Sequence, residues 1–143
     1  MSSNQDVMRP SLVPGLINNF EYNFNRGAQK FKIFEVGNVF TKEESWKSLA
    51  GLLFFDKSSS DWSGSFQSSF YDLRKSIDLF FSRLNIEPVY NKASINHLHP
   101  GISAEIKMKT KSIGNIGILH PAIQRELKLP DIVLFEINLD SIK

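Results

Sequence analysis

The stretch FKIFEVGNVF at residues 31–40, followed by SLAGLLFF at residues 48–55, decides the predicted fold of this chain. Both segments are rich in aromatic, β-branched and other apolar residues, which is typical of β-strands. Gly37 and Asn38 could bend or bulge the first strand. Twelve residues of the chain are phenylalanine, so we expect a core built largely from aromatic rings.

The last third of the chain adds short strands and one short helix. Residues 113–119 and 132–139 are apolar segments of strand length, and Pro121 can begin a helix that ends near Lys128. A further half-buried strand is predicted where apolar residues alternate with charged ones. Its apolar positions are Ala104, Ile106 and Met108.

A longer helix is predicted over residues 12–26, because apolar residues recur there at helical spacing. Ser11 is a suitable N-cap and Gly27 follows as a stop. The apolar stripe is broad, so it either packs wholly into the core or is shared with a second polypeptide. The stripe, which is the candidate subunit interface, consists of Leu12, Val13, Leu16, Ile17, Phe20 and Phe24.

A second helix is predicted over residues 70–84, where Ser69 and Asp72 resemble a capping box. The serine-rich residues 56–69 before it are expected to form a surface loop, and residues 1–10 a flexible lead-in. Strands and helices do not alternate regularly. The predicted fold is therefore a single α+β domain over residues 1–143, with a mostly antiparallel sheet flanked by helices.

Composition excludes several classes of protein. The chain has 143 residues, 41% of them apolar and 22% charged, with a formal net charge of +2, so it is neither disordered nor a strongly basic nucleic-acid module. It has no cysteine, which excludes disulfides, thiolate metal sites and a cysteine nucleophile and suits a reducing cytoplasm. We expect no secretory signal at the N-terminus and no membrane contact.

Few residues of the sequence indicate a metal-binding or catalytic site. His97, His99 and His120 could hold zinc together, but no convincing fourth ligand accompanies them, and turn or surface roles beside prolines are favoured. We expect no metal site. No nucleophile elbow or glycine-rich phosphate loop is present, so neither a catalytic nor a cofactor-binding residue is predicted.

Lys107, Lys109 and Lys111 would project to one side of a single strand. Such a row could contact an RNA backbone, and its binding would then weaken steeply with salt. A solvated face that protects an edge strand from pairing is the favoured interpretation, because no aromatic residues are interleaved with the lysines.

Seven short strings, in order, resemble the core region of the β subunit of bacterial phenylalanyl-tRNA synthetase. Each string is weak alone, but together they cover nearly the whole chain. They are MRPSLVPGL (residues 8–16), FEVGNVF (34–40), LAG (49–51), YDL (71–73), HPGISAEI (99–106), GILHP (117–121) and FEINLD (135–140).

The resemblance implies a fold similar to the catalytic domain of class II aminoacyl-tRNA synthetases, in a copy that has lost catalytic activity. It implies that the active site belongs to the α subunit, which activates phenylalanine with ATP and Mg²⁺ and transfers it to tRNA. This chain would dock the α subunit in a cytoplasmic heterotetramer of two α and two β subunits, and would meet tRNA through that complex. Contact with RNA through the lysine row is the alternative function.

The chain departs from the family pattern at two positions, Ile102 and Asn38, where the family usually or often has arginine. The residues themselves also argue against adenylation. A class II site needs a cation, typically arginine, for the ATP phosphates and an acid for Mg²⁺. No arginine stands in the strand around Glu35, and no glycine-rich segment with arginine follows Glu136. We therefore expect this chain alone to be inactive.

Overall fold

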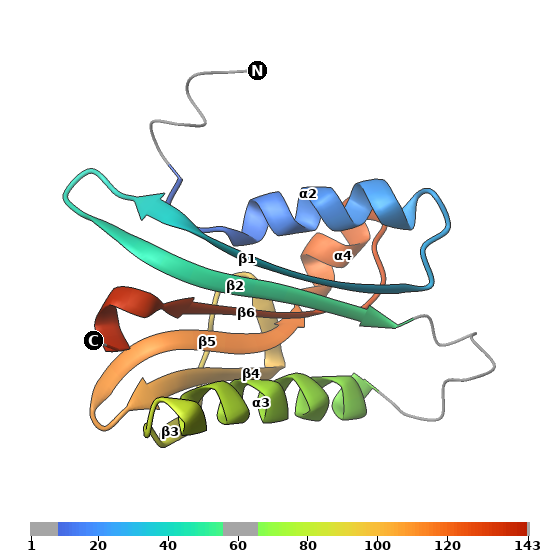
Figure 1. Cartoon of the computed structure of the whole chain (residues 1–143). Helices are drawn as coiled ribbons and strands as arrows, with labels where there is room; N and C mark the ends of the chain where they lie inside the picture. Colours follow the sequence, from blue (N-terminus) through green and yellow to red (C-terminus); the bar gives the residue numbers. More distant parts are fainter. Residues whose placement is uncertain (1–8, 56–65, 143) are drawn as a thin grey trace.

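The computed structural model describes residues 9–55 and 66–142. Six antiparallel strands form one sheet in the order β1-β2-β6-β5-β4-β3. Figure 1 shows α2 and α4 on one face of the sheet and α3 on the other. The elements are α2 (Val13–Phe24), β1 (Lys30–Phe40), β2 (Ser45–Phe55), α3 (Phe66–Arg83), β3 (Pro88–Lys92), β4 (Leu98–Met108), β5 (Lys111–Leu119), α4 (Pro121–Leu127), β6 (Val133–Asn138) and the 3₁₀ helix η1 (Leu139–Ile142). The predicted α+β fold with an antiparallel sheet is confirmed.

Two apolar clusters lie on the two faces of the sheet. Successive residues of a strand point to opposite faces, so each central strand contributes to both clusters. In β6, Leu134 packs into the cluster beneath α2, while Val133 and Phe135 pack into the cluster beneath α3. The central strands β2, β5 and β6 are therefore covered on both sides.

Helix α2 is capped differently from the sequence prediction. Leu12 is the N-cap residue and provides no side-chain cap. Its backbone N–H donates to the Glu136 carboxylate at 2.9 Å, and the Val13 N–H donates to Ser11 Oγ at 3.0 Å. The helix ends before its predicted limit, and Gly27 follows with a φ of 92° in the left-handed region.

Helix α3 begins at Phe66, so residues 66–69 of the predicted loop belong to the helix; residues 56–65 lie outside the described part. The reason is visible in the sequence, because Phe66 and Phe70 extend the helical spacing of the apolar stripe that continues at Leu73. Ser69 lies inside the helix and is not its cap. Asn85, with a φ of 59°, is the predicted C-terminal stop.

The predicted bulge at Gly37 and Asn38 is wrong, because β1 and β2 pair residue for residue along their whole length. Gly37 serves a different purpose. A Cβ there would come within 2.7 Å of Arg9 Nη2 and 3.3 Å of Leu12, so glycine allows the segment before α2 to lie against the strand. Strand β3, a five-residue edge strand with a weak apolar pattern, was not predicted. No helix in the described ranges is long and apolar enough to span a membrane.

Candidate functional site

The predicted interface stripe on α2 is not exposed in this structure. Phe20 is fully buried and contacts the rings of Phe24, Phe31 and Phe54 at centroid distances of 5.4, 5.6 and 5.0 Å. Phe24 is partly buried against the same cluster. The others, also buried there, are Leu12, Val13, Leu16 and Ile17. The stripe is therefore the inner face of α2 and packs against the chain's own sheet, which corrects its prediction as a docking surface.

An exposed apolar surface lies on the opposite face of the sheet. Phe34 and Val36, both in edge strand β1, are 47% and 57% exposed. They border a groove of about 400 Å³ between β1 and α3, which we call the apolar groove. Its lining includes Phe34, Val36, Leu49, Phe80, Phe135 and Leu139. Large apolar side chains left exposed side by side often mark a binding surface.

Gly51 shapes the floor of the apolar groove. It lies in β2 between Phe34 of β1 and Phe135 of β6 in a cross-strand row. The two rings approach to a centroid distance of 5.9 Å above it. A Cβ at Gly51 would overlap the Phe135 ring and come within 2.7 Å of Phe34. Glycine therefore allows the exposed ring of Phe34 to rest on the buried ring of Phe135.

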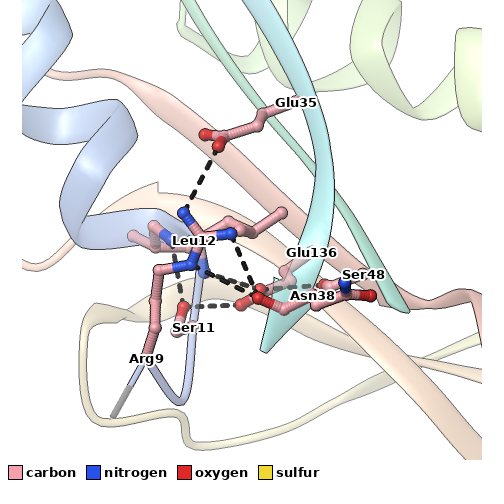
Figure 2. Close-up of polar contacts among 8 residues, drawn as sticks. Arg9, Ser11, Leu12, Glu35, Asn38, Ser48 and Glu136 are labelled. Carbon is pink, nitrogen blue, oxygen red and sulfur yellow. Dashed lines mark hydrogen bonds and ion pairs between the residues drawn. The ribbon is translucent and has the colours of Figure 1, made fainter. Parts of the chain in front are cut away.

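A polar network centred on Glu136 lies on the α2 face of the sheet (Figure 2). One carboxylate oxygen accepts from Ser11 Oγ at 2.7 Å, and the other accepts from the Leu12 N–H and Ser48 Oγ, each at 2.9 Å. Ser48 is buried and also lies 3.2 Å from the Ile137 carbonyl oxygen. Glu136 thus joins the start of α2 to two central strands. A lone acidic residue in an apolar strand was the only sequence signal for this role.

Arg9 holds the segment before α2 against the outer edge of β1 (Figure 2). Its Nε and Nη2 donate to the Asn38 carbonyl oxygen at 3.3 and 3.0 Å, and Nη1 lies 3.7 Å from a Glu35 carboxylate oxygen. The Phe40 N–H donates to the Arg9 carbonyl oxygen at 2.8 Å. Arg9 therefore contacts the sheet; the flexible lead-in over residues 1–10 stays a prediction, and residues 1–8 lie outside the described part.

A second cavity, of about 420 Å³, lies between α2 and α4, and we call it the α2–α4 pocket. Its lining includes Val13, Ile17, His97, Ile123, Leu127 and Glu136. The His97 Nε2 atom is buried and has no hydrogen-bond partner among the described residues. Burial lowers the pKa of His97, and the nearby negative charge of Glu136 opposes that shift.

The three histidines proposed as weak zinc candidates have separate surroundings. Nδ1 of His99 accepts from the Gly101 N–H at 2.9 Å, and Nδ1 of His120 accepts from the Ala122 N–H at 3.0 Å as the N-cap of α4. Over residues 9–55 and 66–142, no group of three or more His, Cys, Asp or Glu side chains could hold a metal ion.

The three lysines do not form a row on one strand, which corrects that prediction. Lys107 lies in β4, 3.6 Å from a Glu105 carboxylate oxygen, and Lys109 lies in the turn with a φ of 61°. Lys111 begins β5 opposite Met108, so it and Lys107 point to opposite faces of the sheet. The three lysines are separated because the chain turns back at Lys109, between β4 and β5. Contact with RNA through these lysines stays a prediction.

A broad hollow of about 1270 Å³ lies between α3 and edge strand β3. The Tyr90 hydroxyl donates to the Asp78 carboxylate at 2.7 Å, and the Arg74 guanidinium lies 4.1 Å from the centre of the Tyr90 ring. Burial and the hydrogen bond to Asp78 both raise the pKa of Tyr90 above its usual value. Tyr90 therefore contacts both Asp78 and Arg74, and these contacts link α3 to β3.

The chemistry of the α2 face does not favour a nucleotide. The α2–α4 pocket and the smaller hollow beside it, which contains Ser48 and Asn115, share the Glu136 carboxylate. Among the described residues that line these two cavities there is no lysine or arginine to meet phosphate groups. The described lining of these two cavities therefore offers a carboxylate and no cationic side chain.

Comparisons with known proteins agree with the fold. The pyrrolysyl-tRNA synthetase PylSc of Desulfitobacterium hafniense superposes with a TM-score of 0.69 over 94% of this chain and 48% of that chain, at 12% identity. A likeness at this level of identity concerns the fold alone. It matches the predicted similarity to a class II synthetase domain.

Sequence relatives identify the family. The chain is 36% identical to the phenylalanine–tRNA ligase beta subunit of Staphylococcus aureus (strain MRSA252) and 39% identical to that of Legionella pneumophila (strain Lens). Each match covers 99% of this chain and 19% of the relative, so the chain spans about a fifth of the length of these curated relatives. The family model described as "Phenylalanyl tRNA synthetase beta chain CLM domain" matches residues 1–139, and the chain therefore belongs to that family.

Proposed function

We propose that this chain is a non-catalytic assembly module of phenylalanyl-tRNA synthetase that binds the catalytic α subunit through the apolar groove. In this proposal the α subunit binds ATP, Mg²⁺ and phenylalanine in the cytoplasm, and tRNA is bound by the (αβ)₂ complex. The relatives are named beta subunits, which implies a second kind of subunit as the partner.

The observation that carries the proposal is the exposure of Phe34 and Val36 beside the groove. Full burial of such a side chain contributes about 1.5–3 kcal/mol, so covering the exposed halves of both would contribute about 1.5–3 kcal/mol in total. The α2 stripe, by contrast, is already buried within the chain, so contact with a partner would bury little more of its apolar surface. The absence of cationic side chains from the described lining of the two α2-face cavities supports a non-catalytic role.

The test compares two valines on the two edge strands of the sheet. Val36 in β1 is 57% exposed beside the groove, and Val89 in β3 is 47% exposed at the opposite edge. Val36→Glu in the full-length β subunit should weaken association with α at least tenfold, equivalent to about 1.4 kcal/mol. Val89→Glu is the matched control and should assemble normally.

Mass photometry of the mixed subunits measures the fraction assembled, and thermal melting of each β variant reports whether it folds. A Val36→Glu subunit that folds and assembles as well as the wild type would contradict the proposal. So would an equal loss of assembly in both variants, because the effect would then not be specific to the groove.

A further inference from the structure

The outer face of α2 carries an exposed aromatic ring with a cation stacked on it. Tyr22 is 58% exposed, and the Arg26 Cζ atom lies 3.7 Å from the centre of its ring. Among the exposed large apolar side chains of the described residues, Tyr22 alone belongs to α2. Helix α2 covers the opposite face of the sheet from α3 and the apolar groove (Figure 1), so this pair lies away from the proposed docking surface.

Amide side chains surround the Tyr22 ring. Residues three or four apart are neighbours on a helix surface, with Cβ atoms about 5–6 Å apart. Exposed asparagines stand at this spacing on either side of Tyr22, namely Asn18, Asn19 and Asn25. Asn19 Oδ1 accepts from Asn23 Nδ2 at 3.0 Å, which orients the Asn19 amide. Each amide offers donors and an acceptor, so the ring lies among groups that can hydrogen-bond the edge of a ligand.

The charge of Arg26 is not neutralised by an ion pair. No carboxylate oxygen of residues 9–55 and 66–142 lies within 4.0 Å of its guanidinium nitrogens. Residues 22–34 contain no aspartate or glutamate, and their cationic residues are Arg26, Lys30 and Lys32. The Arg26 N–H donates to the Asn23 carbonyl oxygen at 3.1 Å, so the turn that ends α2 fixes the backbone of Arg26. An anionic ligand would therefore meet a positioned cation without displacing an ion-paired carboxylate.

A second tyrosine–arginine pair shows what distinguishes this one. The Arg74 guanidinium lies 4.1 Å from the centre of the Tyr90 ring, but Tyr90 is half-buried and its hydroxyl donates to Asp78 at 2.7 Å. That pair is therefore engaged in contacts within the chain. Tyr22 and Arg26, by contrast, are both exposed and have no acidic partner among the described residues, so both remain open to a ligand.

These features together define a ligand class. Unpaired bases stack on tyrosine rings and guanidinium planes, amide side chains hydrogen-bond base edges and ribose hydroxyls, and guanidinium groups bind phosphate. A protein partner is disfavoured, because a single ring gives little apolar surface to bury. We propose that the outer face of α2 binds single-stranded RNA at what we call the Tyr22 platform, with a base stacked on Tyr22 and a phosphate at Arg26. The platform consists of Asn18, Asn19, Tyr22, Asn25 and Arg26.

The test uses the full-length β subunit in its complex with α, and a short oligouridylate that contains 4-thiouridine. Irradiation cross-links the thiouracil to residues in contact with it, and mass spectrometry of the digested complex identifies those residues. Cross-links should fall on the Tyr22 platform, because its ring and amides would contact the base. The absence of cross-links within residues 18–26 would overturn the proposal.

Arg26→Gln removes the charge and leaves the Tyr22 ring as a cross-linking target. At subsaturating RNA the yield is proportional to the affinity, so the yield at Tyr22 should fall at least fivefold. For one phosphate contact, an about fourfold rise in salt concentration should lower the wild-type yield roughly 2.5-fold, and Arg26→Gln should lose that dependence. Arg125→Gln removes an exposed arginine of α4 on the same face of the sheet (Figure 1), so it is the matched control and should cross-link as the wild type does.

An unchanged yield in Arg26→Gln, or an equal fall in both variants, would refute the assignment. Both variants should assemble with α normally, and mass photometry without RNA measures this separately from the docking proposal. Loss of assembly in Arg26→Gln would make the platform a protein interface and would also overturn the assignment.

Discussion

Replacing Glu136 by alanine should release the start of α2 from the sheet. The magnitude follows from its three donors. The Leu12 N–H is fixed in the backbone of a residue that is 1% exposed, so the loss of its acceptor at 2.9 Å should cost about 1–3 kcal/mol. The Ser48 hydroxyl can still donate to the Ile137 carbonyl oxygen at 3.2 Å, so losing its bond to Glu136 should change the free energy of unfolding only slightly. Loss of the bond from Ser11 adds about 1 kcal/mol, for a total of about 3 kcal/mol.

Glu105→Ala is the matched control. Glu105 is also a half-buried carboxylate on a strand of the same sheet, but its ion pair with Lys107 joins side chains that are 33% and 32% exposed. Pairs of that kind contribute about 0–1 kcal/mol. The assay is urea unfolding of both variants followed by far-ultraviolet circular dichroism, which gives the free energy of unfolding. Amide exchange should also become faster in the first turn of α2 for Glu136→Ala alone. A difference of less than about 1 kcal/mol between the two variants would refute the reasoning.

Three further changes have defined outcomes. Gly51→Ala forces a methyl group against the buried ring of Phe135 and should lower the free energy of unfolding by about 1–3 kcal/mol, measured by urea titration; unchanged stability would contradict the tight packing. Phe20→Ala should cost about 3–5 kcal/mol in thermal or chemical unfolding, because the ring is fully buried within the chain; a variant that melts normally yet fails to assemble with α would return the α2 stripe to the interface. Burial lowers the pKa of His97 below its ordinary 6.5, so the unfolded chain binds more protons and stability should fall as pH drops below about 6.5; His97→Leu should flatten that slope in unfolding measured between pH 7 and pH 5.

The sequence alone predicts most elements of this fold, because their patterns are local. Residues 48–55 are dense in apolar side chains and lie within β2, and the stripe containing Leu73 and Ile77 lies on the inner face of α3. Boundaries shifted where polar residues entered an element, as Ser69 does inside α3. Serine favours caps and turns, so its presence placed the predicted start of this helix too late.

The candidate site was less predictable, since it depends on which element covers which face. Periodicity identifies the apolar side of α2, but only the assembled sheet shows that Phe20 and Leu16 face the chain's own core. Likewise, the strand pattern of β1 gave no indication that Phe34 and Val36 would remain exposed at an edge. The Glu136 network joins residues 124 and 125 positions apart, a relation that no local window contains.

The position of β6 in the sheet has a consequence for how the chain folds during synthesis. Although β6 follows the other five described strands in sequence, it lies between β2 and β5, and its Glu136 carboxylate accepts from the backbone N–H at the start of α2. The β1–β2 and β4–β5 hairpins can form early from nearby residues, but they remain two separate halves until β6 leaves the ribosome and joins them. Contacts of such high sequence separation slow folding, so this domain should reach its native state only after β6 has been synthesised, and its unpaired strand edges should stay open to chaperones until then.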